Sequence, residues 1–147
     1  MTLQRVTHVG ICVSDPARSL RFYRDLLGFR ELTSLDVSGT HVDRLLGLSG
    51  VKLHATYLER DGLRIELLHY ETPGHAGPSE PRAMNQLGLT HLSIRVEDLA
   101  GELETLRAAG VCVLDATRIG VAAVRSHAVF VTDPDGTRIE LVESPDA

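Results

Sequence analysis

The chain has 147 residues, which is enough for one compact domain or for two small halves that share a core. The formal net charge is -5, and the 15 basic residues are interspersed with acidic ones, so the basic footprint of a nucleic-acid-binding protein is absent. Hydrophobic residues make up 43% of the chain, and no apolar run approaches membrane-spanning length. We therefore expect a cytoplasmic protein with neither nucleic acid nor a membrane as its partner.

The first half is expected to begin with a strand and then a helix. Asp15 is placed to cap that helix, Pro16 suits its first position, and Gly28 suits its end. A turn at Asp61-Gly62, between two strand-like segments, predicts a hairpin. The expected elements are a strand at 6–13, a helix at 16–27, a strand at 29–35, a short helical turn within 36–50, and hairpin strands at 51–59 and 63–70.

The second half is expected to repeat this order after a linker at residues 71–88, which hold three prolines and three glycines. Asp98 is the expected helix cap and Gly110 the expected stop. Both cysteines, Cys12 and Cys112, lie among apolar strand residues and are expected to be buried thiols. The expected elements are a strand at 90–96, a helix at 99–109, a strand at 111–114, and hairpin strands at 125–132 and 137–142.

Two stretches of the sequence occur twice. Residues 61–67 return as residues 135–141 with Asp-Gly, Arg-Ile-Glu and Leu at the same places. Residues 7–9 return as residues 90–92, a Thr-His pair followed by an aliphatic residue. A repeat of this kind predicts a duplicated β-α-β-β-β unit. Each half carries one histidine and one glutamate in the same order, which gives the set His8, Glu66, His91 and Glu140.

These four residues are predicted to lie on the sheet faces that the helices leave free. Strand residues point alternately to the two faces of a sheet. Val9 and the aliphatic residues in its alternation form a face that suits packing under a helix, so His8 lies on the other face. Glu66 likewise lies opposite the apolar residues of its strand, and the second half shows the same alternation. His69 alternates away from Glu66 and is therefore excluded as its companion ligand.

Two imidazoles and two carboxylates suit a divalent metal ion. Unpaired carboxylates on an enclosed face would cost at least a few kcal/mol each, and a cation between them removes that cost. A duplicated unit would also keep a histidine and a glutamate in both copies by descent, so the pattern alone leaves a purely structural role open.

The sequence resembles the vicinal oxygen chelate superfamily over nearly its whole length. The resemblance implies an α+β fold in which two tandem βαβββ modules form a curved, half-open mixed β-barrel with helices outside. Module one would span residues 5–70, the linker 71–88 and module two 89–143, together forming one domain. The matching segments are residues 7–9, 22–29, 64–68, 88–92 and 132–141.

The resemblance implies an enzyme that uses a divalent metal ion. Its ligands would be His8, Glu66, His91 and Glu140, with nickel, cobalt, zinc or manganese expected ahead of Fe(II). The expected chemistry is that of an isomerase, epimerase or lyase of the glyoxalase or epimerase type. The metal would polarise a substrate carbonyl while a metal-site glutamate moves the proton on the neighbouring carbon. Glu140 is the expected base, with Glu66 as the alternative catalytic residue.

Two other functions stay open within the same resemblance. A small-molecule (drug) binding resistance protein would use the cavity without a metal, and a single-domain Fe(II) dioxygenase would use His8, His91 and Glu140 as an open facial site. The Asn-Trp-Gly stretch typical of glyoxalase I is absent from residues 69–74. Asp43 is the only acid in the region where epimerase-like members carry an extra catalytic carboxylate.

Four polar residues are candidates for contacting a small-molecule substrate: His54, Tyr57, Arg125 and His127. Strand alternation places His54 and Tyr57 on opposite faces of one strand, whereas Arg125 and His127 share a face of the symmetry-related strand. Arg125 suits an anionic substrate group. The resemblance implies a homodimer, and the sequence leaves open whether the metal ligands come from one chain or from two.

Overall fold

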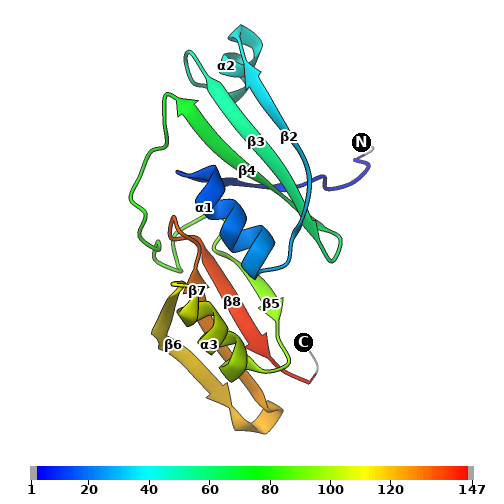
Figure 1. Cartoon of the computed structure of the whole chain (residues 1–147), viewed down its shortest axis with the longest axis vertical. Coiled ribbons are helices and arrows are strands. Elements are labelled where there is room, and N and C mark those ends of the chain that lie inside the picture. Colours follow the sequence, from blue (N-terminus) through cyan, green and yellow to red (C-terminus); the bar gives the residue numbers. More distant parts are fainter. Residues whose placement is uncertain (1–2, 146–147) are drawn as a thin grey trace. The chain divides into compact units, whose positions relative to one another are not determined.

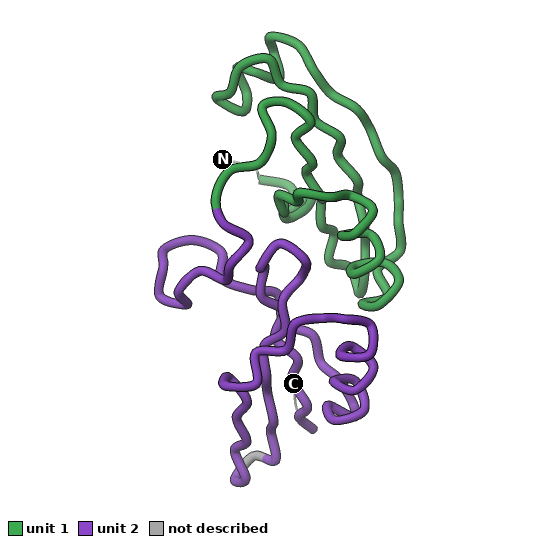
Figure 2. The backbone as a smooth tube through the Cα atoms, turned by 60° about the vertical axis from the view of Figure 1, so that its left-hand side comes forward, with its two compact units in different colours: residues 1–77 green, residues 78–147 purple. Residues whose placement is uncertain are grey.

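The computed structural model describes residues 3–145, in which two helix-and-sheet units follow one another along the chain (Figure 1). The boundary between the units lies between Gly77 and Pro78, within the predicted linker (Figure 2). Each unit contains one four-stranded mixed sheet.

Unit 1, residues 1–77, has its strands in the order β1-β4-β3-β2. Strand β1 runs parallel to β4, and the other neighbours are antiparallel. Its elements are β1 (Val9–Cys12), α1 (Pro16–Leu20), a π-helical continuation (Arg21–Leu26), β2 (Arg30–Ser38), α2 (Thr40–Leu46), β3 (Lys52–Arg60) and β4 (Leu63–Thr72).

Helix α1 begins and ends as its sequence predicts. The Asp15 carboxylate accepts a hydrogen bond from the Arg18 backbone N–H at 3.0 Å, and Pro16 occupies the first turn. The helix then widens, because the Leu27 N–H bonds to the Phe22 carbonyl five residues back. Gly28 ends the segment with a φ of 70°.

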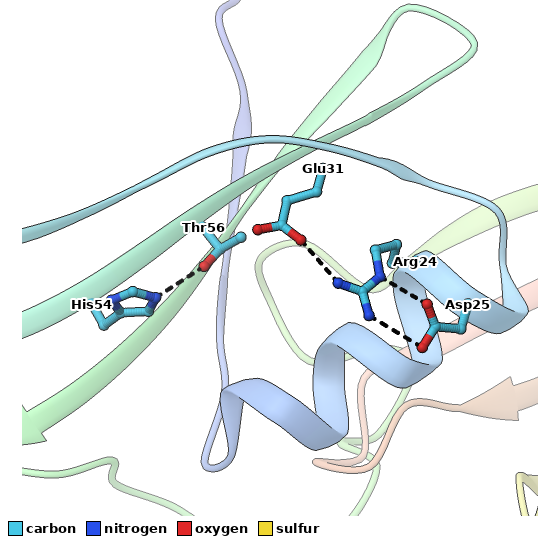
Figure 3. Close-up of polar contacts among 5 residues, drawn as sticks. All are labelled: Arg24, Asp25, Glu31, His54 and Thr56. Carbon is cyan, nitrogen blue, oxygen red and sulfur yellow. Dashed lines mark hydrogen bonds and ion pairs between the residues drawn. The ribbon is translucent and has the colours of Figure 1, made fainter.

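The core of unit 1 lies between this helical segment and one face of the sheet. Most of the buried side chains are apolar and come from the helix and from both central strands, and the polar Ser19 and Thr56 are buried among them. Arg24 closes the end of the helical segment by bridging the carboxylates of Asp25 and Glu31, which ties it to β2 (Figure 3). Among the most deeply buried side chains of the unit are Tyr23, Leu58 and Ile65. A separate apolar cluster joins α2 to the other sheet face and contains Val42, Val51, Leu53, Leu68 and Tyr70.

Unit 2, residues 78–147, repeats this topology with the strand order β5-β8-β7-β6. Helix α3 is capped by the Asp98 carboxylate, which accepts from the Gly101 N–H at 3.0 Å. Glu143 adds a second acceptor, for the Leu99 N–H at 2.8 Å. Its elements are β5 (His91–Arg95), α3 (Leu99–Ala108), β6 (Cys112–Val121), a 3₁₀ turn (Ala122–Val124), β7 (Ser126–Thr132) and β8 (Arg138–Glu143).

The strand registers confirm that the two units are copies of one βαβββ module. Gly10 pairs with Glu66 in unit 1, and Ser93 pairs with Glu140 in unit 2. Both pairs belong to a parallel ladder with the same alternation of faces. The predicted α+β fold of two tandem modules is therefore confirmed, although neither sheet closes into a barrel by itself.

Strand β6 runs further than the sequence predicts, to Val121 instead of residue 114. Its pairing with β7 is interrupted between Leu114 and Ile119. Thr117 fills the interruption, because its hydroxyl donates to the Leu114 carbonyl at 2.7 Å and accepts from the Phe130 N–H at 3.0 Å. The strand resumes after this bulge, and single-sequence alternation does not reveal such a continuation.

The prediction of buried cysteines is wrong. Cys12 and Cys112 are both exposed, and neither forms a disulfide. Cys12 pairs with Leu68, so it lies on the Glu66 face of the sheet and not on the face that packs under α1.

No helix within residues 3–145 combines the length and the apolar character needed to cross a membrane.

Candidate functional site

In unit 1 the predicted histidine and glutamate are neighbours. His8 immediately precedes β1, and the parallel pairing of β1 with β4 brings it beside Glu66. The distance from His8 Nε2 to Glu66 Oε2 is 3.0 Å. The other ring nitrogen, Nδ1, lies 3.1 Å from the Thr7 hydroxyl. Without a cation, Nε2–H donates to the carboxylate and Nδ1 accepts from the Thr7 hydroxyl. With a cation between the two groups, Nδ1–H would donate to Thr7 and leave the Nε2 lone pair for the metal, as in a metal-ligating histidine.

Unit 2 builds the same arrangement from its own residues. His91 Nε2 lies 3.6 Å from Glu140 Oε2, and the Thr90 hydroxyl lies 2.8 Å from His91 Nδ1. Both histidine–glutamate pairs are half-buried. The sequence repeat therefore corresponds to a repeated local geometry, and Thr7 and Thr90 belong to it. The recurring Thr-His dipeptide was the signal in the sequence that could have identified these threonines.

An aromatic ring contacts each imidazole edge-on. The rings of His8 and Tyr57 have centroids 5.4 Å apart and planes at 82°. The rings of His91 and Phe130 have centroids 5.3 Å apart and planes at 80°. Tyr57 is paired with Glu66 across the strands, and Phe130 is paired with the corresponding glutamate of unit 2. These rings limit the orientations open to the two imidazoles.

Each carboxylate also receives a hydroxyl hydrogen bond. In unit 1 the donor is Tyr57, and its bond to Glu66 together with burial raises the pKa of Tyr57 to about 12. In unit 2 the Ser93 hydroxyl donates to Glu140 Oε2 at 2.8 Å. Ser93 shares the sheet face of His91 and Glu140, so strand alternation in the sequence could have identified it as a neighbour of this glutamate.

The donor sets fit a divalent metal ion. Two donors that each lie ~2.1 Å from one ion stand about 3.0–3.4 Å apart for bond angles between a right angle and the tetrahedral angle. The observed separations of 3.0 Å and 3.6 Å between Nε2 and Oε2 are close to this spacing. Imidazole nitrogen with carboxylate oxygen is a donor chemistry suited to first-row transition metals. Within residues 3–145 no group of three His, Cys, Asp or Glu side chains forms a ligand cluster, so each unit by itself offers a pair of donors.

Tyr57 is the predicted substrate contact that the structure places beside a histidine–glutamate pair. His54 lies on the opposite face of β3, where its Nδ1 is 2.7 Å from Asp36 Oδ1 and its Nε2 is 3.3 Å from the Thr56 hydroxyl (Figure 3). Thr56 itself is buried on the face that carries α1.

The two predicted contacts from unit 2 lie away from its histidine–glutamate pair. His127 is paired with Glu143 and therefore lies on the sheet face opposite to that of Glu140. Its ring lies against Gly120. Arg125 is exposed in the turn before β7, where it has a positive φ of 48°. The structure therefore does not bring Arg125 and His127 together with Glu140 on one sheet face.

Asp43 has a structural position in the first turn of α2. Its two carboxylate oxygens accept from the backbone N–H groups of Val51, at 2.8 Å, and Gly50, at 2.9 Å. These two bonds lower the pKa of Asp43. The carboxylate thus fixes the loop between α2 and β3, and both of its oxygens are engaged by the protein backbone.

The chain was compared with known proteins and structures. A family model, described as the Glyoxalase/Bleomycin resistance protein/Dioxygenase superfamily, matches residues 5–141. A protein of Vibrio cholerae named probable lactoylglutathione lyase is 30% identical over 149 residues, which cover 100% of this chain and 96% of that protein. A lactoylglutathione lyase of Pseudomonas aeruginosa is 29% identical, with coverages of 93% and 81%. The crystal structure of a glyoxalase family protein from Bacillus cereus has a TM-score of 0.84 at 20% identity, with coverages of 98% and 96%, which shows a shared fold.

Proposed function

This chain belongs to the glyoxalase/bleomycin resistance protein/dioxygenase superfamily, and on that premise we propose that it is a divalent-metal-dependent lyase of the glyoxalase I type. The observation that carries the proposal is the duplicated geometry in which a threonine-held imidazole faces a glutamate, at 3.0 Å in one unit and 3.6 Å in the other. The curated relatives named lactoylglutathione lyase support the reaction class.

The proposed metal ligands are His8, Glu66, His91 and Glu140, and nickel, cobalt, zinc and manganese are the candidate ions. When bound, the ion supplies Lewis acidity toward a substrate carbonyl oxygen. Thr7 and Thr90 fix the two imidazole rings through Nδ1, so that Nε2 is the nitrogen presented to the ion.

Glu140 is the proposed proton carrier. The reaction would be the isomerisation of a hemithioacetal, the adduct of a 2-oxoaldehyde and a thiol, to a 2-hydroxyacyl thioester. A proton leaves the carbon that bears the sulfur and is returned to the neighbouring carbon, so no oxidant or second substrate is consumed. A carboxylate that takes and returns this proton accounts for the transfer between the two carbons, while the hydroxyl proton on the sulfur-bearing carbon passes to the oxygen of the neighbouring carbon. Glu66 is the alternative carrier, acting from the opposite side of the substrate carbon.

Of the candidate substrate contacts, Tyr57 is the proposed one, because it lies beside His8 and Glu66. His54 and His127 lie on the sheet faces opposite the glutamates, which does not favour a direct contact with the same substrate. A homodimer and a small-molecule substrate complete the proposal.

The proposal is tested by metal analysis combined with an activity assay. The protein is purified without chelating resin, its metal content is measured, and thioester formation is followed with methylglyoxal adducts of several thiols. We expect stoichiometric nickel, cobalt, zinc or manganese, with turnover that a chelator abolishes and added metal restores. Metal-free protein that binds a drug but forms no thioester would instead identify a binding module. Bound Fe(II) with oxygen uptake would identify a dioxygenase.

A further inference from the structure

The carboxylates of Glu66 and Glu140 have different neighbours at two equivalent strand positions. At each position, one unit has a hydroxyl group where the other has none. The strand registers make Gly10 the counterpart of Ser93, since each pairs with the glutamate of its own unit. They also make Tyr57 the counterpart of Phe130. In unit 1 the hydroxyl is therefore on β3, from Tyr57, and the β1 position is a glycine without a side chain. In unit 2 the hydroxyl is on β5, from Ser93, and the β7 position is a phenylalanine without a hydroxyl.

The two units obtain their hydroxyls from different strands. A Cβ atom added to Gly10 would lie 3.1 Å from the Leu68 Cδ1 atom, so a serine at this position would require the end of that side chain to shift by a few tenths of an ångström. Phe130 offers its ring to His91 but carries no hydroxyl for the carboxylate. The hydroxyl that reaches Glu66 therefore depends on a tyrosine in the central strand β3.

The two donors also differ in how firmly they hold a carboxylate. The Tyr57 hydroxyl is carried on a rigid ring, and that ring is itself packed edge-on against His8. The Ser93 hydroxyl reaches Glu140 from a side chain without a ring, and the ring against His91 comes from a different residue, Phe130. The Glu66 side chain is 14% exposed and lies 3.0 Å from its histidine, whereas Glu140 is 27% exposed and lies 3.6 Å from its histidine. By the exposure of its carboxylate and the shorter separation of its donors, unit 1 holds its glutamate more closely than unit 2 does, although His8 is slightly more exposed than His91.

We propose that Tyr57 is a positioning residue that holds Glu66 and His8 in their metal-binding arrangement, so that unit 1 supplies the more tightly organised pair of ligands. The inference rests on the proposed function, because it assigns a role toward the same metal. Tyr57 acts through its hydrogen bond to the carboxylate and its ring contact with the imidazole. Outer contacts of this kind contribute roughly 10–100-fold to metal affinity.

The test is a titration of the metal-free protein with nickel, together with the absorption spectrum of the cobalt form. Tyr57→Phe keeps the ring and removes the hydroxyl, and we expect roughly 10–100-fold weaker nickel binding and a shifted cobalt spectrum. Tyr70→Phe is the matched control. Tyr70 lies on the same strand face as Glu66 but belongs to the α2 cluster, so its loss should leave the affinity within about twofold of the wild type. Ser93→Ala should weaken nickel binding less than Tyr57→Phe does.

A double-mutant cycle separates positioning from a general structural effect. If Tyr57 acts through Glu66, then adding Tyr57→Phe to Glu66→Gln should cause little further loss of nickel affinity. Full additivity of the two losses would overturn the proposal, as would a Tyr57→Phe variant that binds nickel as the wild type does. Equal losses in Tyr57→Phe and Tyr70→Phe would overturn it too. A wild-type protein that binds no divalent metal would refute the proposed function itself, which the first titration reveals before any variant is made.

Discussion

The Glu140 side chain is half-buried, and one of its two carboxylate oxygens is engaged by neighbouring side chains. Its Oε2 atom accepts from Ser93 at 2.8 Å and faces His91 at 3.6 Å. Glutamine keeps the shape of the side chain and an acceptor for Ser93, but it can neither accept the substrate proton nor bind a metal as a carboxylate does. We expect Glu140→Gln to lower thioester formation by at least about 100-fold. Activity is measured under metal saturation, and folding is checked by thermal unfolding.

The matched control for this change is Glu104→Gln, on an exposed position of α3. This variant should keep the wild-type rate and unfolding midpoint. A Glu140→Gln protein with wild-type turnover would remove Glu140 from the mechanism and leave Glu66 as the candidate carrier.

The lowered pKa of Asp43 predicts that the free energy of unfolding depends on pH. Hydrogen bonds from the Val51 and Gly50 N–H groups lower its pKa from the usual 3.8 in the folded state. A lowered folded-state pKa means that the contribution is fully present above the ordinary value of 3.8 and is lost as the pH falls from there through the lower pKa of the folded state. Asp43→Asn should therefore be less stable than the wild type at neutral pH, and the difference should shrink below pH 3.8. Urea unfolding of both proteins across this pH range measures the difference in stability. A difference independent of pH would contradict the stabilising role assigned to the Asp43 carboxylate.

At the residue scale, the sequence predicted which histidines and glutamates lie together within each half. His8 with Glu66 and His91 with Glu140 follow from the repeat and from strand alternation. Alternation also showed that His54 and Tyr57 point to opposite faces, but it could not say which of them shares the face of Glu66. That choice depends on the register between β3 and β4, which is set by the hairpin and by packing across strands.

At the element scale, the two hairpin turns look alike in sequence and differ in their surroundings. Gly62 has a φ of 80° and open space where a Cβ would be. Gly136 has a φ of 87°, and a Cβ there would lie 2.7 Å from the Ser79 carbonyl oxygen. The β7–β8 turn therefore packs under the backbone of the segment that precedes β5. The β3–β4 turn faces open space at the same position.

This difference predicts unequal effects of one substitution. Gly62→Ala should destabilise the protein by about 1–2 kcal/mol, the cost of a left-handed residue with a Cβ. Gly136→Ala should cost a further ~1–3 kcal/mol, because the backbone of Ser79 must move to relieve the overlap. Urea unfolding of both variants gives the two values. Equal destabilisation would show that Gly136 is constrained by its backbone angle alone.

Most elements could be predicted from periodicity and caps, and the exceptions have physical causes. Asp15 and Asp98 both cap helices as expected. The widening of the helix after Leu20 is invisible in the sequence, because it depends on which carbonyl each N–H selects. The continuation of β6 past Leu114 is equally hidden, since Thr117 bridges a bulge by bonds to a residue on another strand.

At the scale of the whole molecule, the proposed metal should stabilise the folded chain. An ion that binds only the folded protein adds about 2.7 kcal/mol of stability at a concentration 100 times its Kd. For a chain of this size that corresponds to a rise of roughly 5–10 °C in the unfolding midpoint. Thermal unfolding with and without nickel measures the shift. The double variant Glu66→Gln with Glu140→Gln should lose most of it, and an unchanged shift in that variant would mean that the ion binds elsewhere.

The repeat predicted the molecular plan of two like units, and the strand registers confirm it. What the repeat could not predict is the substrate, because the features that two copies share cannot distinguish one family member from another. The differences between the copies carry that information. In the described residues they include α2, whose place between two strands is taken in unit 2 by a short 3₁₀ turn, and the longer interruption in the pairing of β6.

Each imidazole is oriented by the residue directly before it in the chain, Thr7 for one and Thr90 for the other. A contact between consecutive residues is inherited whole whenever its strand is copied, and it needs no adaptation in a distant segment. The hydroxyls on the carboxylates come from separate strands, and there the two copies have diverged to Tyr57 and Ser93. Both copies have thus kept the Thr-His dipeptide together with the histidine–glutamate pair, whereas the hydroxyl donors around the carboxylates have diverged.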